Sequence, residues 1–341
     1  MNKKIKVGLN GFGRIGRTIF RQLFSSNKFE IVHINDIHPD IHNLCYLLNF
    51  DTMHGRFEND ASVDSDSIVI GEKHVRVTHS PMITEAGWSE SGVELLIESS
   101  GYKPNIPVIR DCLSETLKKV LFSDSPEDMD ITIANGVNED EYSKDHHHII
   151  SSSICDVIGT APILKIINDK FGVKNAFLQT LHPWLNYQNI MDGTLNQDVI
   201  KDPSGKAYGI GRASPNNLIP KNTSLGSALL KVIPDLKGKL STMSYRVPTD
   251  IVGSCSMVID LKNKVTKDEV VSFMQSAEKK PIIELSDDPI VSSDVKHHKS
   301  SCIVDMRWID ILDNKLRIIT WYDNEWGYVN RLCDNLERIS S

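Results

Sequence analysis

The sequence lacks the features of a membrane protein, a nucleic-acid-binding protein or a disulfide-stabilised protein. It has no apolar run of about 18 residues that could cross a bilayer. Its formal net charge of −7 argues against nucleic acid as a partner, because duplex binding needs a basic surface. The 6 cysteines include no Cys-x-x-Cys pair, so neither a disulfide framework nor a metal site is expected. The N-terminus also lacks the apolar segment of a signal peptide, and we expect a cytoplasmic protein with reduced thiols.

The length and composition are those of a globular protein with two domains. The chain has 341 residues, 40% hydrophobic and 24% charged, and about 150 residues per domain predicts two domains with sizeable cores. The first half alternates strand-like and helix-like runs, which predicts an α/β, doubly wound sheet, whereas the strand-rich second half is expected to be α+β. The predicted strands are 4–10, 30–35, 67–70, 93–98, 120–123, 148–150, 175–181, 241–246, 251–261, 301–309 and 316–321.

A glycine-rich turn follows the first predicted strand. Gly11, Gly13 and Gly16 form the pattern Gly-x-Gly-x-x-Gly, and a helical run follows them. In this context the first glycine makes the tight turn, the second admits the pyrophosphate of a dinucleotide, and the third allows close packing. Asp36 follows the second strand about 20 residues later, where a carboxylate binds the adenosine ribose. Because that carboxylate repels a 2′-phosphate, the sequence predicts NAD rather than NADP.

Small residues end two further predicted strands. Ser99 and Ser100 follow strand 93–98, and Ser123 ends strand 120–123. The carboxyl ends of parallel strands line the ligand crevice of a doubly wound sheet, so these serines are candidates for facing the cofactor. A simple role in the turns is almost equally compatible with the sequence.

A cysteine, Cys155, stands where a strand gives way to a helix. Small polar residues over 151–153 lead to it, and an apolar run over 163–167 predicts one helix from Cys155 to about residue 172. Unpaired N–H groups and the dipole at a helix start stabilise a thiolate, which can lower the pKa of a cysteine from about 8.5. Cys155 is therefore a candidate nucleophile, although from this window alone a buried structural cysteine is favoured.

Four further features complete the pattern. His182 stands at the end of strand 175–181. The polar, glycine-rich stretch over 186–217 is too long for an ordinary connection and is expected to be functional. Helices are expected over 224–232 and from Asn324 onward, where apolar residues recur at four-residue spacing.

Several motifs together resemble the glyceraldehyde-3-phosphate dehydrogenase family over the whole chain. The matching stretches are Asn10–Arg17, Asp51–Phe57, the Cys155 turn, Arg246–Thr249 and Trp321–Tyr328. The resemblance implies a Rossmann-type NAD domain over 1–154, with the C-terminal helix 324–341 packing back on it. It also implies an α+β catalytic domain with a mostly antiparallel sheet over 155–323, and usually a homotetramer that works in glycolysis.

The resemblance also assigns roles to residues. Cys155 lies where the family has its nucleophile and His182 where it has its base, at the family's usual spacing. Asn324 would bond the nicotinamide carboxamide. The expected cofactor-binding residues are Asn10, Gly11, Phe12, Gly13, Arg14, Ile15, Asp36, Ser99, Ser123 and Asn324.

The implied reaction is the NAD-dependent oxidation of an aldehyde. The Cys155 thiolate adds to the aldehyde and gives a hemithioacetal. His182 takes the hydroxyl proton as hydride leaves for NAD, which gives a thioester, and backbone N–H groups at the helix start stabilise the oxyanion. Asp156 follows the nucleophile directly, where its charge could raise the pKa of the thiol unless the side chain points away.

The residues around the nucleophile depart from the family pattern. Phosphorylating members have Ser-Cys-Thr-Thr-Asn, in which the two hydroxyls beside the thiol help to hold inorganic phosphate, but here Ile154 and Asp156 flank it. Leu185 replaces a threonine of the substrate-phosphate site, and 194–202 looks like an insertion. Arginines and a threonine still match phosphate-binding positions, although a serine replaces one glycine. The candidate substrate-binding residues are Ile154, Asp156, Leu185, Arg212, Thr223, Ser224 and Arg246.

These observations leave three functions open. The first is oxidation of a short phosphorylated or otherwise anionic aldehyde, by default D-glyceraldehyde 3-phosphate, with inorganic phosphate as one choice of acyl acceptor. The second is a non-phosphorylating relative, similar to erythrose-4-phosphate dehydrogenase or a biosynthetic paralogue, in which water releases the acyl group; Asp156 and Leu185 motivate it. The third is a non-catalytic NAD-binding paralogue, against which the retention of Cys155 and His182 argues.

Overall fold

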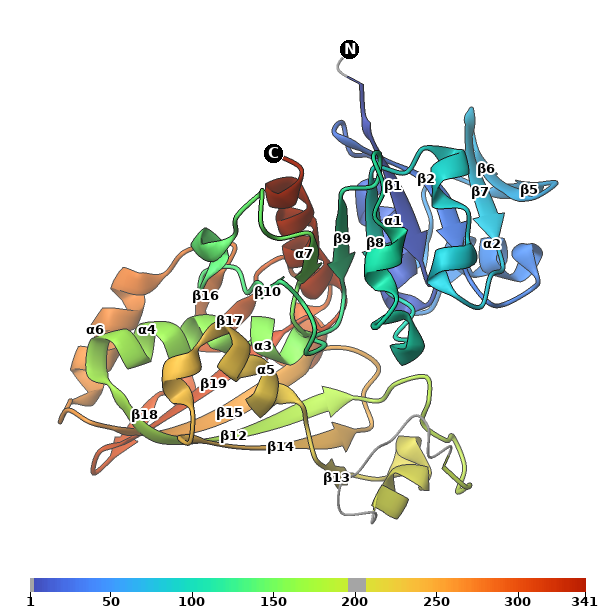
Figure 1. The fold of residues 1–341 in the computed structure, drawn as a ribbon. Coiled ribbons are helices and arrows are strands. Elements are labelled where there is room, and N and C mark those ends of the chain that lie inside the picture. The colour runs from blue at the N-terminus through green and yellow to red at the C-terminus, as the bar shows by residue number, and fades with distance from the viewer. Residues whose placement is uncertain (1–2, 196–206) are drawn as a thin grey trace. The chain divides into compact units, whose positions relative to one another are not determined.

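The computed structural model describes residues 3–195 and 207–341, and the chain forms two compact units (Figure 1). The first unit comprises Met1–Ile133, Glu139–Ser153 and Val329–Ser341. The second comprises Ala134–Asn138 and Ile154–Tyr328. Most of the expected insertion over 194–202 lies outside the described residues.

The first unit is built on a mainly parallel sheet of nine strands, in the order β10-β11-β9-β8-β1-β2-β7-β6-β5. β1 pairs in parallel with β2 on one side and with β8 on the other, so the strand order reverses beside β1. In a doubly wound sheet such a reversal opens a ligand crevice at the carboxyl ends of the strands. The strands are β1 (Ile5–Asn10), β2 (Phe29–Asn35), β5 (Ser62–Asp64), β6 (Ser67–Ile70), β7 (Lys73–Thr78), β8 (Leu95–Glu98), β9 (Lys119–Phe122), β10 (Ile131–Thr132) and β11 (Ile149–Ser151).

Helices and a small hairpin complete the first unit. They are α1 (Arg14–Leu23), α2 (Ile41–Asn49), the hairpin β3 (Phe50–Asp51) and β4 (Gly55–Arg56), and the part of α7 (Trp326–Ile339) from Val329 onward. The predicted apolar face of α7 is buried, with Leu332 and Leu336 fully covered. Asn335 Nδ2 also donates to Ser152 Oγ at 3.2 Å, which ties the helix to the segment after β11.

The second unit has a mostly antiparallel sheet, in the order β13-β14-β12-β15-β19-β17-β16 with β18 paired to β19. β12 is central to the site because it pairs in parallel with β14 and antiparallel with β15. The strands are β12 (Val173–Pro183), β13 (Ile219–Lys221), β14 (Leu240–Val247), β15 (Gly253–Leu261), β16 (Ile283–Ser286), β17 (Cys302–Asp305), β18 (Asp310–Leu312) and β19 (Lys315–Tyr322). The predicted fold class is confirmed for both units.

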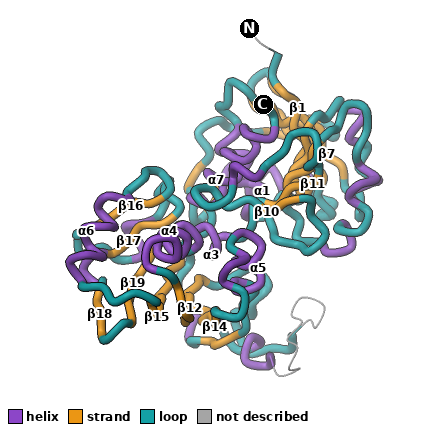
Figure 2. Tube along the Cα trace, turned by 60° about the vertical axis from the view of Figure 1, so that its left-hand side comes forward, coloured by secondary structure: helices purple, strands orange, loops and turns teal. Residues whose placement is uncertain are grey.

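One face of the second sheet is covered by helices, and Figures 1 and 2 show α3, α4 and α5 on that face. Along β12 the side chains alternate, so that Thr180 and His182 are buried while Phe177 and Leu181 point to the exposed face. This alternation sends His182 toward the helices. The helices of the unit are α3 (Cys155–Ile158), α4 (Ala161–Phe171), α5 (Leu225–Val232) and α6 (Lys267–Ala277).

The structure corrects several predicted elements. The single helix expected from Cys155 is two helices, because α3 ends at Ile158 and α4 starts afresh with Pro162 in its first turn, where proline is tolerated. The strand expected over 301–309 ends at Asp305. The helices α2 and α6 were not predicted. None of the helices in the described ranges is long and apolar enough to cross a membrane.

Candidate active site

The glycine-rich turn of the first unit has the geometry of a phosphate-binding loop. A Cβ at Gly16 would lie 2.1 Å from the Gly11 carbonyl oxygen, so α1 can pack against the turn only with glycine there. Gly11 has a φ of +89°, and a Cβ there would lie 2.5 Å from the backbone of Ser100. Beside Gly13, by contrast, no heavy atom lies within 4 Å of a Cβ position, and this N-cap receives no side-chain hydrogen bond. The start of α1 is therefore open to an anion.

The predicted ribose-binding carboxylate is held in place beside this loop. Asp36 Oδ2 accepts from the Phe12 N–H at 2.7 Å and Oδ1 accepts from the His38 N–H at 2.9 Å. The side chains of Asn10 and Ser99 bond within the protein instead: Asn10 Nδ2 donates to Glu98 and Ser99 Oγ donates to the Gly11 carbonyl. These bonds support the turn, while both carboxylate oxygens of Asp36 are oriented by backbone N–H groups.

Ser123 lies at a pocket in the same unit. The pocket forms at the carboxyl ends of β8 and β9 and is lined by Glu98, Gly101, Tyr102, Phe122 and Ser123, among others. This is the edge of the sheet at which a doubly wound fold binds its ligand. The position of Ser123 is therefore compatible with the expected cofactor contact.

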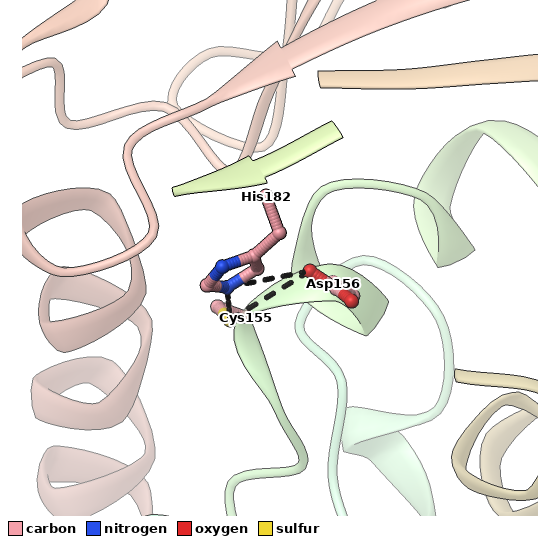
Figure 3. Close-up of side chains that lie close together, drawn as sticks. All are labelled: Cys155, Asp156 and His182. Carbon is pink, nitrogen blue, oxygen red and sulfur yellow. Dashed lines mark hydrogen bonds and ion pairs between the residues drawn. The ribbon is translucent and has the colours of Figure 1, made fainter. Parts of the chain in front are cut away.

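In the second unit Cys155 lies against His182 (Figure 3). Cys155 begins α3 and is partly exposed, and its Sγ lies 3.6 Å from Nε2 of the buried His182. The other ring nitrogen, Nδ1, is 2.8 Å from the Pro183 carbonyl oxygen. Since a carbonyl only accepts, Nδ1 carries the proton and Nε2 presents its lone pair to the thiol. The imidazole is thus oriented to take a proton from Cys155.

The expected lowering of the Cys155 pKa is wrong for this structure. Burial raises the pKa of the thiol well above its ordinary value, and the negative charge of Asp156 raises it further. Arg246 and the N–H groups of Cys155 and Asp156 lower the pKa, as the helix start predicts, but their effect is smaller. Burial and the charge of Arg246 lower the pKa of His182 to about 4. Both shifts favour a neutral thiol and a neutral imidazole in the resting pair.

Asp156 does not point away from the nucleophile. Its Oδ1 lies 3.8 Å from Cys155 Sγ and 3.9 Å from His182 Nε2, and the residue is buried (Figure 3). The Tyr322 hydroxyl donates to the same oxygen at 2.8 Å and holds the carboxylate there. Tyr322 was not a predicted site residue, and nothing in its sequence surroundings links it to a residue so distant in the chain.

Two cationic side chains, Arg246 and Lys221, lie on the sheet face that carries His182. Arg246 on β14 pairs in register with both His182 and Ile219, so its side chain lies on the same face as the imidazole. Lys221 lies on that face too, two residues after Ile219. Burial, reinforced by Arg246, lowers the pKa of Lys221 to about 8. Lys221 was also missed, although strand alternation from Ile219 predicts its direction.

Arg246 has an incomplete set of partners. Its Nη2 donates to the Tyr187 hydroxyl at 3.2 Å. Its Nε is buried and, within the described part of the chain, has no hydrogen-bond partner. Buried donors are rarely left unpaired in native proteins, so this N–H group is available to an anionic or polar ligand.

The other predicted substrate residues differ in their surroundings. Arg212 is exposed and its Nε donates to Asp192 at 2.9 Å, so the structure does not bring it into hydrogen-bond contact with the Cys155 cluster. Thr223 Oγ1 accepts from the Leu225 N–H at 3.2 Å, and Ser224 is the exposed N-cap of α5. Ile154, as the N-cap of α3, and Leu185, in a turn closed by Gln188, are half-buried.

Asn324 has one half of its amide already engaged. Its Oδ1 accepts from the Val252 N–H at 2.8 Å, and the side chain is 5% exposed. The oxygen is thereby fixed, which leaves Nδ2 as the group that can donate to a ligand. A carboxamide oxygen, as in nicotinamide, is a suitable acceptor.

The fold and these residues place the chain in the class of dinucleotide-binding oxidoreductases. Comparison with family models narrows the class. Residues 5–105 match the model described as "Glyceraldehyde 3-phosphate dehydrogenase, NAD binding domain". Residues 154–324 match the model described as "Glyceraldehyde 3-phosphate dehydrogenase, C-terminal domain".

Curated relatives from the same family are similar to this chain over nearly its full length. The chain is 36% identical over 334 residues to glyceraldehyde-3-phosphate dehydrogenase 1 of Bacillus subtilis, covering 97% of this chain and 96% of the relative. It is 37% identical over 336 residues to glyceraldehyde-3-phosphate dehydrogenase of Streptomyces coelicolor, covering 97% of each. The chain belongs to the glyceraldehyde-3-phosphate dehydrogenase family. It is an NAD-dependent oxidoreductase of that family, as the glycine loop and Asp36 predicted.

Proposed function

We propose that the protein oxidises a short anionic aldehyde, by default D-glyceraldehyde 3-phosphate, through a covalent intermediate on Cys155 with His182 as the base. One observation carries this proposal: Cys155 Sγ lies 3.6 Å from a ring nitrogen whose lone pair faces it, because the other nitrogen donates to Pro183. The relatives named above are glyceraldehyde-3-phosphate dehydrogenases, which supports the choice of substrate.

The first step uses the pair in its neutral resting state. As the sulfur bonds to the carbonyl carbon of the aldehyde, its proton passes to His182 Nε2 and then to the substrate oxygen, giving a neutral hemithioacetal. His182 next accepts the hydroxyl proton at Nε2, and the C–H electron pair leaves as hydride, giving a thioester. NAD, when bound, supplies the hydride acceptor. The low pKa of His182, about 4, keeps the imidazole unprotonated at neutral pH, with Nε2 free of a proton before each transfer.

The cations near the cluster support an anionic substrate. Arg246 has a buried Nε without a protein partner in the described residues, and Lys221 lies on the same sheet face. A phosphate group can accept from both side chains, and charge-assisted hydrogen bonds are the stronger kind. The family motif expected Arg246, while Lys221 is an additional cation of this chain.

For the acyl acceptor, the surroundings of Cys155 leave two candidates, inorganic phosphate and water. Inorganic phosphate is the family's acceptor, but the Asp156 carboxylate lies 3.8 Å from the sulfur and repels an approaching phosphate. The same carboxylate can accept a proton from water, which favours the second candidate function, hydrolytic release of the acyl group. A steep dependence of steady-state NADH formation on added phosphate would exclude the hydrolytic version.

A panel of short aldehydes, followed by NADH absorbance with and without phosphate, tests the substrate proposal. We expect the phosphorylated aldehydes to be preferred. Absence of turnover on every aldehyde, together with slow alkylation of Cys155 that is unaffected by His182→Ala, would instead support the non-catalytic NAD-binding paralogue. Fast alkylation of Cys155 that depends on His182 would exclude that alternative.

We also propose a cytoplasmic homotetramer with a glycolytic role, as the family resemblance implies. The face of the second sheet opposite the helices supports self-association, because in the described structure Phe177 and Leu181 are 62% and 41% exposed there and Val258 lies on the same face. Apolar patches of this kind are often buried between subunits. Light scattering on the eluting peak of a sizing column would give the subunit number directly.

A further inference from the structure

We propose that Cys155, Asp156 and His182 form a binding site for a thiophilic divalent cation, Zn²⁺ above all, and that the bound cation reversibly blocks the enzyme. The binding part of this proposal is independent of the proposed function, whereas the inhibition rests on Cys155 being the nucleophile. Among the described residues this is the group of sulfur, nitrogen and carboxylate donors that could share one ion, with all donor atoms within 4.8 Å of one another.

The donor set suits zinc. Zn²⁺ is bound in proteins by cysteine sulfur, histidine nitrogen and carboxylate oxygen, usually with tetrahedral geometry, and three protein donors leave the fourth position for water. Cys155, His182 and Asp156 supply one donor of each kind. Hard cations such as Mg²⁺ and Ca²⁺ prefer sets made wholly of oxygen, so they are poor candidates for this site.

The spacing of the donors also fits. Zinc–ligand distances of about 2.0–2.3 Å at tetrahedral angles require about 3.3–3.7 Å between neighbouring donor atoms. The observed separations are 3.6 Å for Sγ to Nε2, 3.8 Å for Sγ to Oδ1 and 3.9 Å for Nε2 to Oδ1. Small side-chain movements therefore suffice to bring all three atoms to one ion.

Neighbouring residues already orient two of the three ligands. Metal-binding histidines commonly donate their second ring N–H to a backbone carbonyl, and His182 Nδ1 does so to Pro183 at 2.8 Å. Ligating carboxylates are likewise hydrogen-bonded by surrounding groups, and Tyr322 donates to Asp156 at 2.8 Å. This support fixes the direction of both donors before any ion arrives.

The charges balance for a divalent cation. The thiolate and the carboxylate together carry two negative charges, which compensate the ion, and the thiol proton is released on binding. Arg246 and Lys221 face the same cluster and oppose a cation, so we expect affinity below that of a structural zinc site. Phosphorylating members of the family have threonine at the position of Asp156, so the carboxylate ligand is a departure of this chain from the family pattern.

Calorimetric titration of the purified full chain with Zn²⁺ tests the site without relying on activity. We expect one ion per chain, and at least tenfold weaker binding in Asp156→Asn, a change that removes the charge while the amide oxygen still accepts from Tyr322. Titration with Co²⁺ provides a second readout, since a sulfur-to-cobalt charge-transfer band should appear and be lost in Cys155→Ser. In the proposed enzyme Zn²⁺ should also stop NADH formation, and a chelator should restore it.

The controls separate this site from adventitious binding. His146→Asn alters the run His146–His148, which could hold a stray ion, and should leave both titrations unchanged. If Asp156→Asn is poorly folded by circular dichroism, His182→Asn removes another ligand and should weaken binding as strongly. Unchanged Zn²⁺ affinity in the folded variants, or loss of binding only in His146→Asn, would overturn the proposal. If the ion binds but activity is unaffected, the proposed role of Cys155 fails rather than the site.

Discussion

The Tyr322 hydroxyl donates a 2.8 Å hydrogen bond to Asp156 and so joins the last strand of the second sheet to the residue after Cys155. The tyrosine ring is fully buried between two glycines: a Cβ would lie 2.2 Å from it at Gly159 and 2.6 Å from it at Gly253. Because the ring cannot move toward either glycine, its hydroxyl position is fixed. The carboxylate is consequently held beside the thiol.

Substitution of Gly159 should disturb this arrangement. Gly159→Ala places a methyl group inside the space of the Tyr322 ring, and overpacking of this kind costs about 1–3 kcal/mol or more. Urea denaturation should show that loss, and the ring displacement should weaken the hold on Asp156. Gly209→Ala is the matched control, since its nearest neighbour lies at 3.9 Å. Equal stabilities of the two variants would contradict the packing described for Tyr322.

Removal of the Asp156 charge should make Cys155 more acidic. The carboxylate raises the pKa of the thiol, so Asp156→Asn lowers that pKa and increases the thiolate fraction at neutral pH. The pH profile of alkylation by uncharged iodoacetamide should therefore shift to lower pH, with Cys155→Ser showing which signal belongs to this thiol. Asp192→Asn, an exposed acid, should leave the profile in place. A profile that does not move in Asp156→Asn would show that burial alone controls the pKa.

Lys221 should matter for anionic substrates and not for neutral ones. Lys221→Met removes one cation from the face that carries Arg246, and a charged hydrogen bond of about 1.5–3 kcal/mol corresponds to a rise in KM of roughly 10–100-fold. The effect should be seen with a phosphorylated aldehyde and be absent with its unphosphorylated counterpart. Lys237→Met, on an exposed position of the same unit, serves as the control. Equal effects on both aldehydes would argue against a role in anion binding.

Asp36 should govern the choice between the two dinucleotides. Its carboxylate is fixed by the N–H groups of Phe12 and His38, so Asp36→Ala removes both the ribose acceptor and the repulsion of a 2′-phosphate. We expect weaker NAD binding and a narrower gap between NAD and NADP, measured by fluorescence titration of each dinucleotide. An unchanged preference would mean that another residue discriminates.

Local sequence patterns predicted most elements of the first unit, and they identified Cys155 and His182 as the candidate reacting pair of the second. The spacing of Gly11, Gly13 and Gly16 after a strand has one common structural solution, and the structure shows why Gly11 and Gly16 need glycine. His182 was expected at a strand end, and alternation along β12 turns it toward the helices. These features depend on neighbours in the sequence, which is why the sequence revealed them.

The direction of Asp156 could not be predicted in the same way. It depends on Tyr322, which is brought to it by the pairing of β19 with β15 and by the glycines on both sides of the ring. The break between α3 and α4 was hidden for a different reason, since the apolar spacing continues across it. The raised pKa of Cys155 followed from burial, which outweighs the N–H groups that suggested the opposite direction.

The central claim is that Cys155 carries the reaction, and Cys155→Ser tests it most directly. NADH formation from D-glyceraldehyde 3-phosphate should fall by at least about a thousandfold, because catalytic groups that act together lose most of their effect when the nucleophile alone is removed. NAD binding, measured on the same preparation by fluorescence titration, should stay at the level of the parent protein. Substantial NADH formation by the serine variant, with NAD bound normally, would contradict the account.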